Sequence, residues 1–352
     1  MTSYSFPLTP PATPGAARPD FGTRLAGYAA PAAPRAADPP QLQQLAGATM
    51  GTNWSLRVVN PRMLPLEAIR AAVRHALDAV VAQMSHWERD AFISRFNRAP
   101  ADSRHTMPDA FSAVLRRALH WAAESGGAMD PSVGRLVGLW GFGPDAADVA
   151  KAPPSAQALA AARACGGWDR IRFDADGRLV QPGGLSLDFS GIAKGFAVDA
   201  GIEALRGLGL ADLLFEVGGE LRGIGRRPGG QPWQVAVDPG DGIALRIALS
   251  DRAVATSGDR WHVREHGGRR WSHTLDPRTG EPVAHALAAV TVLHATCMDA
   301  DALATVLTVL GRAEGLAFAD RHGVAALFAE RPAGAGGLLL HESAAWAAQA
   351  VS

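Results

Sequence analysis

The spacing of apolar residues predicts a mixture of helices and strands. Between residues 66 and 86 the apolar side chains fall on one stripe of a helical wheel, as on a helix that packs one face against a core. The same spacing predicts further helices over residues 109–125, 194–206, 299–310 and 313–321. The first of these ends at Gly126 and Gly127, and glycine is common just beyond a helix.

Short apolar runs set between Gly, Pro and Asp turns predict strands, mostly in the second half of the chain. The expected strands cover residues 54–59, 170–173, 213–217 and 233–237. Residues 136–142 are apolar but punctuated by glycine, so their pattern leaves helix and strand open. Helices and strands mix without regular alternation. We therefore expect an α+β fold of mixed sheets with packed helices, not a regular doubly wound sheet.

Residues 1–40 differ from the rest of the chain because they are rich in Pro and Ala and lack apolar periodicity. We expect them to form a disordered leader, followed by one folded domain over residues 41–345. The leader has neither the basic start and apolar run of a secretory signal nor a cysteine that would carry a lipid. The sequence therefore predicts a cytoplasmic protein with no membrane span.

The charge composition gives no support for a nucleic-acid or membrane partner. Of 352 residues, 34 are basic and 34 acidic, so the formal net charge is zero and gives no electrostatic reason to bind nucleic acid or an anionic membrane. We expect no nucleic-acid partner. Cys165 and Cys297 lie far apart without the spacing of a zinc site or a disulfide framework, and we expect both to be small core residues.

Residues 187–199 (LDFSGIAKGFAVD) place an acid, a glycine and a lysine at an expected strand-to-helix transition. Glycine there lets the backbone approach a ligand closely, as in a nucleotide or metal site. The alternative is a plain corner in which Asp188 only caps the helix. This segment alone does not decide between the two.

Asp301 and Thr305 are four residues apart and share one face of an expected helix. A carboxylate and a hydroxyl are hard oxygen donors that suit Mg²⁺. Alternatively, Asp301 belongs to the first turn of the helix and Thr305 bonds back to a carbonyl. His273 fits a general base or a structural residue beside a turn, and Trp87 fits a platform for a ring system or a core position.

An ordered set of segments resembles the flavin transferases of the ApbE family, the FAD:protein FMN transferases. The resemblance covers roughly residues 45 to 343. It rests on residues 49–52 (TMGT), 85–87 (SHW), 94–97 (SRFN), 130–134 (DPSVG), 188–199, 217–220 (VGGE), 255–259 (ATSGD), 273–280 (HTLDPRTG) and 300–305 (ADALAT).

The resemblance implies an FAD-binding enzyme that uses Mg²⁺ to transfer FMN from FAD to a threonine hydroxyl of a target flavoprotein, releasing AMP. By similarity, the side chains of Asp301 and Thr305 and the backbone carbonyl of Gly191 hold the metal, and His273 activates the acceptor hydroxyl. The residues that fall where the family contacts FAD are Met50, Trp87, Ala128, Met129, Asp130, Asp188, Lys194 and Leu275.

Several alternatives remain open within the resemblance. A metal-dependent FAD pyrophosphatase would give FMN and AMP with water as the acceptor, and a flavin-binding carrier would not turn FAD over. Mn²⁺ favours similar oxygen ligands to Mg²⁺. Trp87 stands where a tyrosine is common in the family. Many members are exported lipoproteins, so a periplasmic location is the alternative to a cytoplasmic one.

Overall fold

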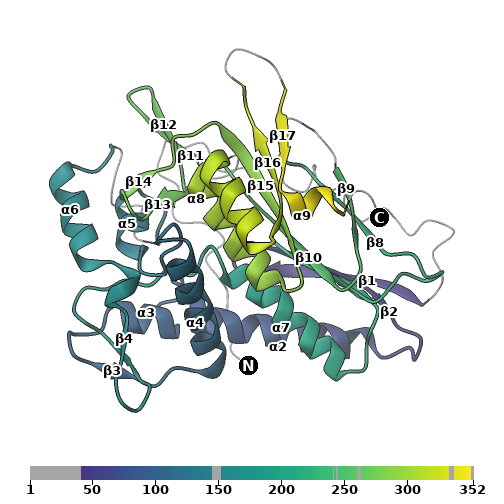
Figure 1. Ribbon diagram of the computed structural model, residues 1–352. Coiled ribbons are helices and arrows are strands. Elements are labelled where there is room, and N and C mark those ends of the chain that lie inside the picture. Colours follow the sequence, from purple (N-terminus) through teal and green to yellow (C-terminus); the bar gives the residue numbers. More distant parts are fainter. Residues whose placement is uncertain are drawn as a thin grey trace.

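The computed structural model describes residues 41–144, 152–240, 242, 245–259, 263–332 and 337–349. The predicted leader, residues 1–40, lies outside the described residues. The centre of the molecule is an eight-stranded antiparallel sheet with the order β1-β2-β6-β7-β10-β15-β16-β17 (Figure 1). Its strands are β1 (Leu42–Thr49), β2 (Thr52–Val59), β6 (Leu213–Val217), β7 (Glu220–Ile224), β10 (Arg252–Gly258), β15 (Leu287–His294), β16 (Ala325–Glu330) and β17 (Leu339–Glu342).

Two tight hairpin turns lie side by side at one end of this sheet. Met50 and Gly51 join β1 to β2 with φ values of 48° and 67°, and Gly218 and Gly219 join β6 to β7 with φ values of 60° and 107°. Positive φ at both central residues is the conformation of the type I′ turn, one of the two that two-residue hairpins favour. The Gly218 amide donates a hydrogen bond of 3.0 Å to the carbonyl of Asn53, so the two turns are held together.

Three long helices form a layer over one face of the sheet (Figure 1). They are α2 (Leu66–Met84), α7 (Ala193–Gly207) and α8 (Cys297–His322). The helix α8 packs against β10 and β15, and α7 lies between α8 and α2. Gly201 brings α7 close to the sheet, because a Cβ atom at this position would collide with the ring of Phe215. The main core lies between these helices and the sheet.

The opposite face of the sheet is covered by the hairpin of β8 (Trp233–Val237) and β9 (Leu245–Leu249) together with α9 (Ala344–Ala347). Trp233 is buried there and its indole N–H donates to the carbonyl of Ile224 at 2.9 Å. This second core buries the other side of β6, β7 and β10, so the central strands are covered on both faces.

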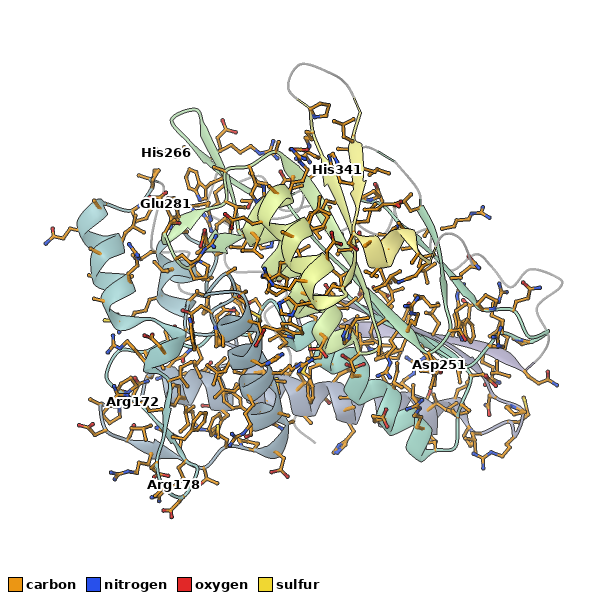
Figure 2. The ribbon with its side chains drawn as sticks, in the orientation of Figure 1. Arg172, Arg178, Asp251, His266, Glu281 and His341 are labelled. Atoms are coloured by element: carbon orange, nitrogen blue, oxygen red, sulfur yellow. The ribbon has the colours of Figure 1, made fainter. Side chains whose placement is uncertain are left out.

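The remaining elements pack beside the helical layer. The helices are α3 (Phe92–Asn97), α4 (Asp109–Glu124), α5 (Gly134–Leu139) and α6 (Ala156–Cys165), with a 3₁₀ turn at Trp168–Arg170. The short strands are β3 (Arg104–His105), β4 (Arg172–Phe173), β5 (Leu179–Val180), β11 (Val263–His266), β12 (Arg269–Ser272), β13 (Leu275–Asp276) and β14 (Glu281–Pro282). Side chains fill the space between the layers, and Arg172 and Arg178 lie at the periphery (Figure 2).

The expected α+β class is confirmed, and several elements differ from their predicted form. The two helices expected over residues 299–310 and 313–321 are one helix, α8, that continues through a non-helical Gly311 (φ 74°). Residues 136–142, for which helix and strand were left open, are helical up to Leu139, where α5 ends. Of the strand expected over residues 170–173, residues 172 and 173 form β4, while Arg170 belongs to a 3₁₀ turn. The residues directly before Asp188, expected to form a strand, make only one isolated bridge, from Ser186 to Val133. Cys297 is buried as expected, but Cys165 is only partly buried.

Among the described residues, α8 is the one helix long and apolar enough to cross a membrane by length and composition alone. Most of its apolar stretch, 61%, is buried inside the protein. It also carries two buried acids, Asp299 and Asp301. Contact with the sheet and with α7 therefore accounts for its apolar sequence, as in the core helix of a globular protein.

Candidate active site

The segment before α7 is an ordered turn organised by Asp188. Its Oδ1 atom accepts a hydrogen bond of 2.7 Å from the Ser190 amide, and its own amide donates to the carbonyl of Pro131 at 2.8 Å. The N-cap position of α7 is Ile192, which lies four residues later. Asp188 therefore does not cap the helix. It ties the turn to the segment that contains Asp130.

Two glycines of this region allow α7 and the turn before it to approach α8 closely. A Cβ atom at Gly191 would lie 2.8 Å from Thr305 Oγ1, a distance that real Cβ atoms do not show. A Cβ atom at Gly195 would collide with the backbone carbonyl of Cys297 and lie 2.8 Å from Asp301 Cβ. The close packing places the three predicted metal ligands, Gly191, Asp301 and Thr305, together at one contact between the two segments.

Asp301 is buried in this contact, with 6% of its surface exposed. Its Oδ2 atom accepts a hydrogen bond of 2.9 Å from the Gly195 amide. Asp301 therefore bonds across to α7, and the acid in the first turn of α8 is Asp299 instead. Burial raises the pKa of Asp301, against the opposing effects of the Lys194 charge and the Gly195 hydrogen bond.

An ion pair between Lys194 and a buried acid, Glu220, adjoins Asp301. The Lys194 ammonium bonds to Glu220 Oε1 and lies 4.0 Å from Asp301 Oδ1. Glu220 is almost fully buried, at 3% exposure, while the side chain of Lys194 is 33% exposed. Burial raises the pKa of Glu220 to about 7, although the Lys194 charge acts in the opposite direction.

The paired hairpin turns complete this side of the site. A Cβ atom at Gly218 would lie 2.9 Å from Thr52 Cγ2 and 3.5 Å from Lys194 Cδ, so the turn lies against the lysine stem. Met50, a predicted FAD contact, occupies the neighbouring turn between β1 and β2. The site therefore lies where the two hairpin turns at this end of the sheet meet α7 and α8.

A second group of predicted FAD contacts surrounds Asp130. Its carboxylate accepts hydrogen bonds from the Ser132 amide at 2.7 Å, the Ser132 hydroxyl at 2.7 Å and the Trp168 amide at 3.1 Å. Burial nevertheless raises the pKa of Asp130 overall. Ala128 and Met129 are buried beside it. A cavity of about 240 Å³ opens here and is lined by Asp130, Ser132, Val133, Leu136, Ala162, Arg163, Gly166, Gly167, Pro277 and Arg278.

Trp87 and His86 lie next to the turn of residues 188–191. Trp87 is 52% exposed, and its ring centroid lies 5.7 Å from that of His86. His86 Nδ1 lies 3.8 Å from Asp188 Oδ2. Trp87 is therefore not a core residue, which was one of its two interpretations from sequence, and its exposed ring is available to a ligand near Asp188.

His273 and Leu275 belong to a separate small cluster. Leu275 is buried among Leu136, Trp140 and Trp271. His273 is partly buried, with its ring centroid 6.2 Å from that of Phe142. The cluster adjoins the Asp130 cavity through Pro277 and Arg278. The role of His273 as a base stays a prediction.

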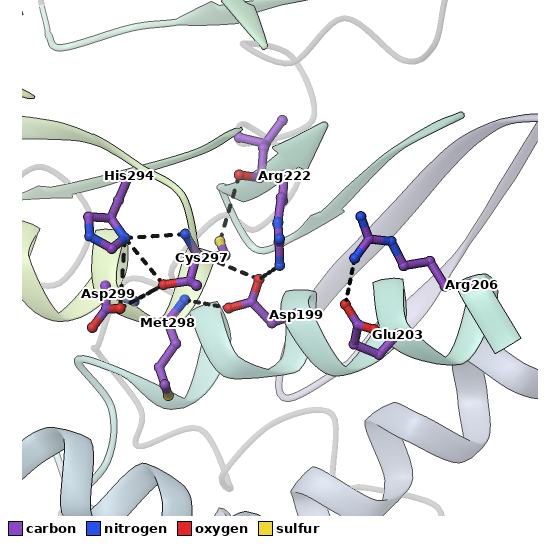
Figure 3. A network of polar contacts seen from close by, with 10 residues as sticks. Asp199, Glu203, Arg206, Arg222, His294, Cys297, Met298 and Asp299 are labelled. Atoms are coloured by element: carbon purple, nitrogen blue, oxygen red, sulfur yellow. Dashed lines mark hydrogen bonds and ion pairs between the residues drawn. The ribbon is translucent and has the colours of Figure 1, made fainter. Parts of the chain in front are cut away.

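A polar network fixes the start of α8 relative to α7 (Figure 3). Asp199 on α7 accepts hydrogen bonds from the amides of Cys297 at 3.1 Å and Met298 at 2.9 Å, and pairs with Arg222 at 2.6 Å. On the other side, Asp299 accepts hydrogen bonds from Arg117, Trp121 and Thr296. Asp301 therefore follows a helix start that is anchored on both sides.

Sequence reasoning gave no role to Glu220 or to His86. Both were part of recognised segments, but their partners, Lys194 and Asp188, are distant in sequence. Glu220 directly follows the pair Gly218 and Gly219, in a segment that contributed only to the family resemblance. The one sequence feature that could have indicated a role for Glu220 is its place directly after a glycine turn.

Comparisons with known proteins identify one family over most of the chain. The model of the ApbE family matches residues 50–328. The FAD:protein FMN transferase of Vibrio cholerae is 34% identical over 295 residues, covering 82% of this chain and 87% of the relative. That of Klebsiella pneumoniae is 36% identical over 275 residues, covering 76% and 78%.

Solved structures show the same architecture. The apo flavinyl transferase ApbE of Pseudomonas stutzeri superposes with a TM-score of 0.79 at 37% identity, covering 87% of this chain and 95% of that structure. The flavin transferase ApbE of Vibrio cholerae gives a TM-score of 0.78 at 32% identity, covering 87% and 99%. The similarity therefore extends over almost the whole length of these proteins.

Proposed function

This chain belongs to the ApbE family, and we propose that it transfers FMN from FAD to a threonine hydroxyl of a target flavoprotein, with Mg²⁺ as cofactor and AMP as the second product. The names of its relatives support flavin transfer from FAD to a protein. The observation that carries the finer proposal is the approach of Gly191 to Thr305 beside the buried Asp301.

The residues at this contact fit a magnesium ion by their chemistry. Asp301 supplies a carboxylate, Thr305 a hydroxyl and Gly191 a backbone carbonyl, and all are hard oxygen donors. The described residues include no group of three or more His, Cys, Asp or Glu side chains able to hold a metal. The three oxygen donors of Asp301, Thr305 and Gly191 suit an ion that also takes oxygen ligands from water and from phosphate groups. When bound, Mg²⁺ neutralises charge on phosphate oxygens during phosphoryl transfer.

In the proposed reaction, the acceptor hydroxyl oxygen bonds to the phosphorus of the FMN half of FAD. The bond from that phosphorus to the bridging oxygen breaks, and AMP leaves with the oxygen. The ammonium of Lys194 contributes positive charge for the diphosphate, and the exposed ring of Trp87 offers a flat face to a ring of FAD. An imidazole nitrogen of His273 takes the hydroxyl proton.

The test is incubation of the purified protein with FAD and Mg²⁺, with and without an acceptor domain that carries the threonine. We expect mass spectrometry to show one FMN added to the acceptor and chromatography to show AMP. Free FMN and AMP with an unmodified acceptor would instead indicate a pyrophosphatase. FAD that survives a long incubation would indicate a flavin carrier, and either result would overturn the proposal.

Substitutions in α8 connect this activity to the site. Asp301→Asn keeps the shape of the side chain but removes its charge, so we expect flavin transfer to fall by about 100-fold or more. Glu314→Gln is the matched control, because Glu314 is an exposed acid on the same helix. Equal activity in Asp301→Asn and the unmodified protein would exclude Asp301 as a metal ligand.

A further inference from the structure

Glu220 is a buried acid for which the proposed reaction has no use. It begins β7 directly after the turn of Gly218 and Gly219, and 3% of its surface is exposed. Its Oε1 atom accepts a hydrogen bond from Lys194, while Oε2 has no hydrogen-bond partner among the described residues. An ionisable group buried in this way costs free energy, which calls for an explanation.

The position of Lys194 between two acids, Glu220 and Asp301, explains why an acid is buried here. Its ammonium is within hydrogen-bonding distance of Glu220 Oε1 but 4.0 Å from Asp301 Oδ1. Both acids are buried, so each attracts the ammonium more strongly than an exposed acid would. Glu220 thus competes with Asp301 for the same cation.

The hairpin turn fixes the outcome of this competition. Gly218 lies close to Lys194 Cδ and to Thr52, so the β6–β7 turn supports the lysine stem on the side of Glu220. Asp301 Oδ2 accepts the Gly195 amide, while Oδ1 lies outside hydrogen-bonding range of Lys194. The second oxygen of Asp301 is therefore not neutralised by a lysine hydrogen bond.

We propose that Glu220 is a positioning residue that holds Lys194 away from Asp301 and so keeps Asp301 Oδ1 available to a divalent cation. This inference rests on the proposed metal site. Without the charge of Glu220, Asp301 becomes the stronger partner for the ammonium. Lys194 then moves onto the carboxylate and competes with the metal for it.

The test measures cation binding directly, without FAD and without turnover. Mn²⁺ is titrated into the purified full-length protein and free Mn²⁺ is followed by electron paramagnetic resonance. The titrations are run at about pH 8 so that a group with a pKa of about 7, as in Glu220, is charged. We expect Glu220→Gln to weaken Mn²⁺ binding by about tenfold. If the unmodified protein does not bind Mn²⁺, the proposed metal site is wrong, which is a distinct outcome from an unchanged affinity in Glu220→Gln.

A double substitution separates the lysine effect from a simple loss of negative charge. In a Lys194→Met background there is no ammonium to move, so we expect Glu220→Gln to change Mn²⁺ affinity by less than about twofold. A tenfold loss that persists in this background would show that Glu220 acts by its charge alone and would overturn the proposal, as would an unchanged affinity in the single variant. If Glu220→Gln does not fold, Glu220→Asp replaces it in both backgrounds. Its shorter side chain draws the carboxylate away from Lys194, so we expect a smaller loss of Mn²⁺ affinity that disappears in the Lys194→Met background, and an unchanged affinity or a loss that persists there would overturn the proposal.

Discussion

Gly191 and Thr305 face each other so closely that a Cβ atom on the glycine would lie 2.8 Å from the threonine hydroxyl oxygen. The two residues come from different segments, one from the turn before α7 and the other from α8. Because the Gly191 carbonyl and the Thr305 hydroxyl are both proposed metal ligands, this contact makes the metal site sensitive to a single added methyl group.

Gly191→Ala is expected to impair metal binding more than folding. The added methyl group displaces the Thr305 side chain, which can rotate, so the free energy of unfolding should change by less than about 1 kcal/mol. Affinity for Mn²⁺ should fall by about tenfold or more, measured by titration. Gly207→Ala is the control, because a Cβ atom at Gly207 on α7 meets nothing within 4 Å. Wild-type affinity in Gly191→Ala would count against Gly191 as a ligand.

Gly195→Ala is expected to damage the fold itself. Its Cβ atom would collide with the backbone carbonyl of Cys297, and backbone cannot rotate away as a side chain can. The helices α7 and α8 must separate, at a cost of about 1–3 kcal/mol or more. Urea denaturation measures the loss. By contrast, Gly207→Ala at the last residue of α7 should change the free energy of unfolding by less than about 0.5 kcal/mol, and similar midpoints for the two variants would contradict the expected helix contact.

Asp199→Ala is expected to destabilise the protein by about 3–5 kcal/mol, because it leaves Arg222 buried without its partner and removes the acceptor for two amides of α8. Thermal or urea denaturation gives the value. Glu203→Ala is the control on the same helix, since its pair with Arg206 is exposed and such pairs contribute little, about 0.5 kcal/mol or less. Equal effects of the two substitutions would refute a special role for Asp199.

His105 is expected to make stability depend on pH. Burial, with a smaller contribution from Arg95, lowers the pKa of His105 below its usual value of 6.5. The folded state therefore binds a proton less readily than the unfolded state. The stabilising effect is complete above about pH 6.5 and is lost as the pH falls through the lowered pKa.

The measurement for His105 is the melting temperature between about pH 7.5 and pH 5. His105→Gln should show a smaller decrease on acidification than the unmodified protein. His75→Gln, at an exposed position on α2, serves as the control and should leave the decrease unchanged. A decrease of equal size in His105→Gln would show that this histidine does not contribute.

The sequence predicted the elements that have a clear apolar pattern and missed those with few buried positions. The expected helix over residues 194–206 matches α7 within one residue at each end. The strand β1 was missed because it is an edge strand in which Leu45 and Thr49 alone are buried. The helix α8 was expected as two helices because Gly311 looks like a stop, yet the chain continues helically beyond it.

The site was predictable where it depends on local spacing. Asp301 and Thr305 share a helix face by virtue of their separation, and the structure places them on α8 as expected. The contact with Gly191 depends on how α7 packs, which no local pattern reveals. The pairing of Lys194 with Glu220 joins residues 26 positions apart on different elements and was equally invisible. His273 lies beside Phe142, and its role as a base stays a prediction.

The strand order has a consequence for protein synthesis. The hydrogen bond from Ser55 to Glu216 joins β2 to β6 across 161 residues. The β1–β2 hairpin therefore cannot pair with β6 until that later strand has been synthesised. Asp301 and Thr305 emerge from the ribosome later still. A nascent chain therefore lacks the proposed metal ligands Asp301 and Thr305 until α8 has been synthesised, and loop closure over such distances makes folding slow.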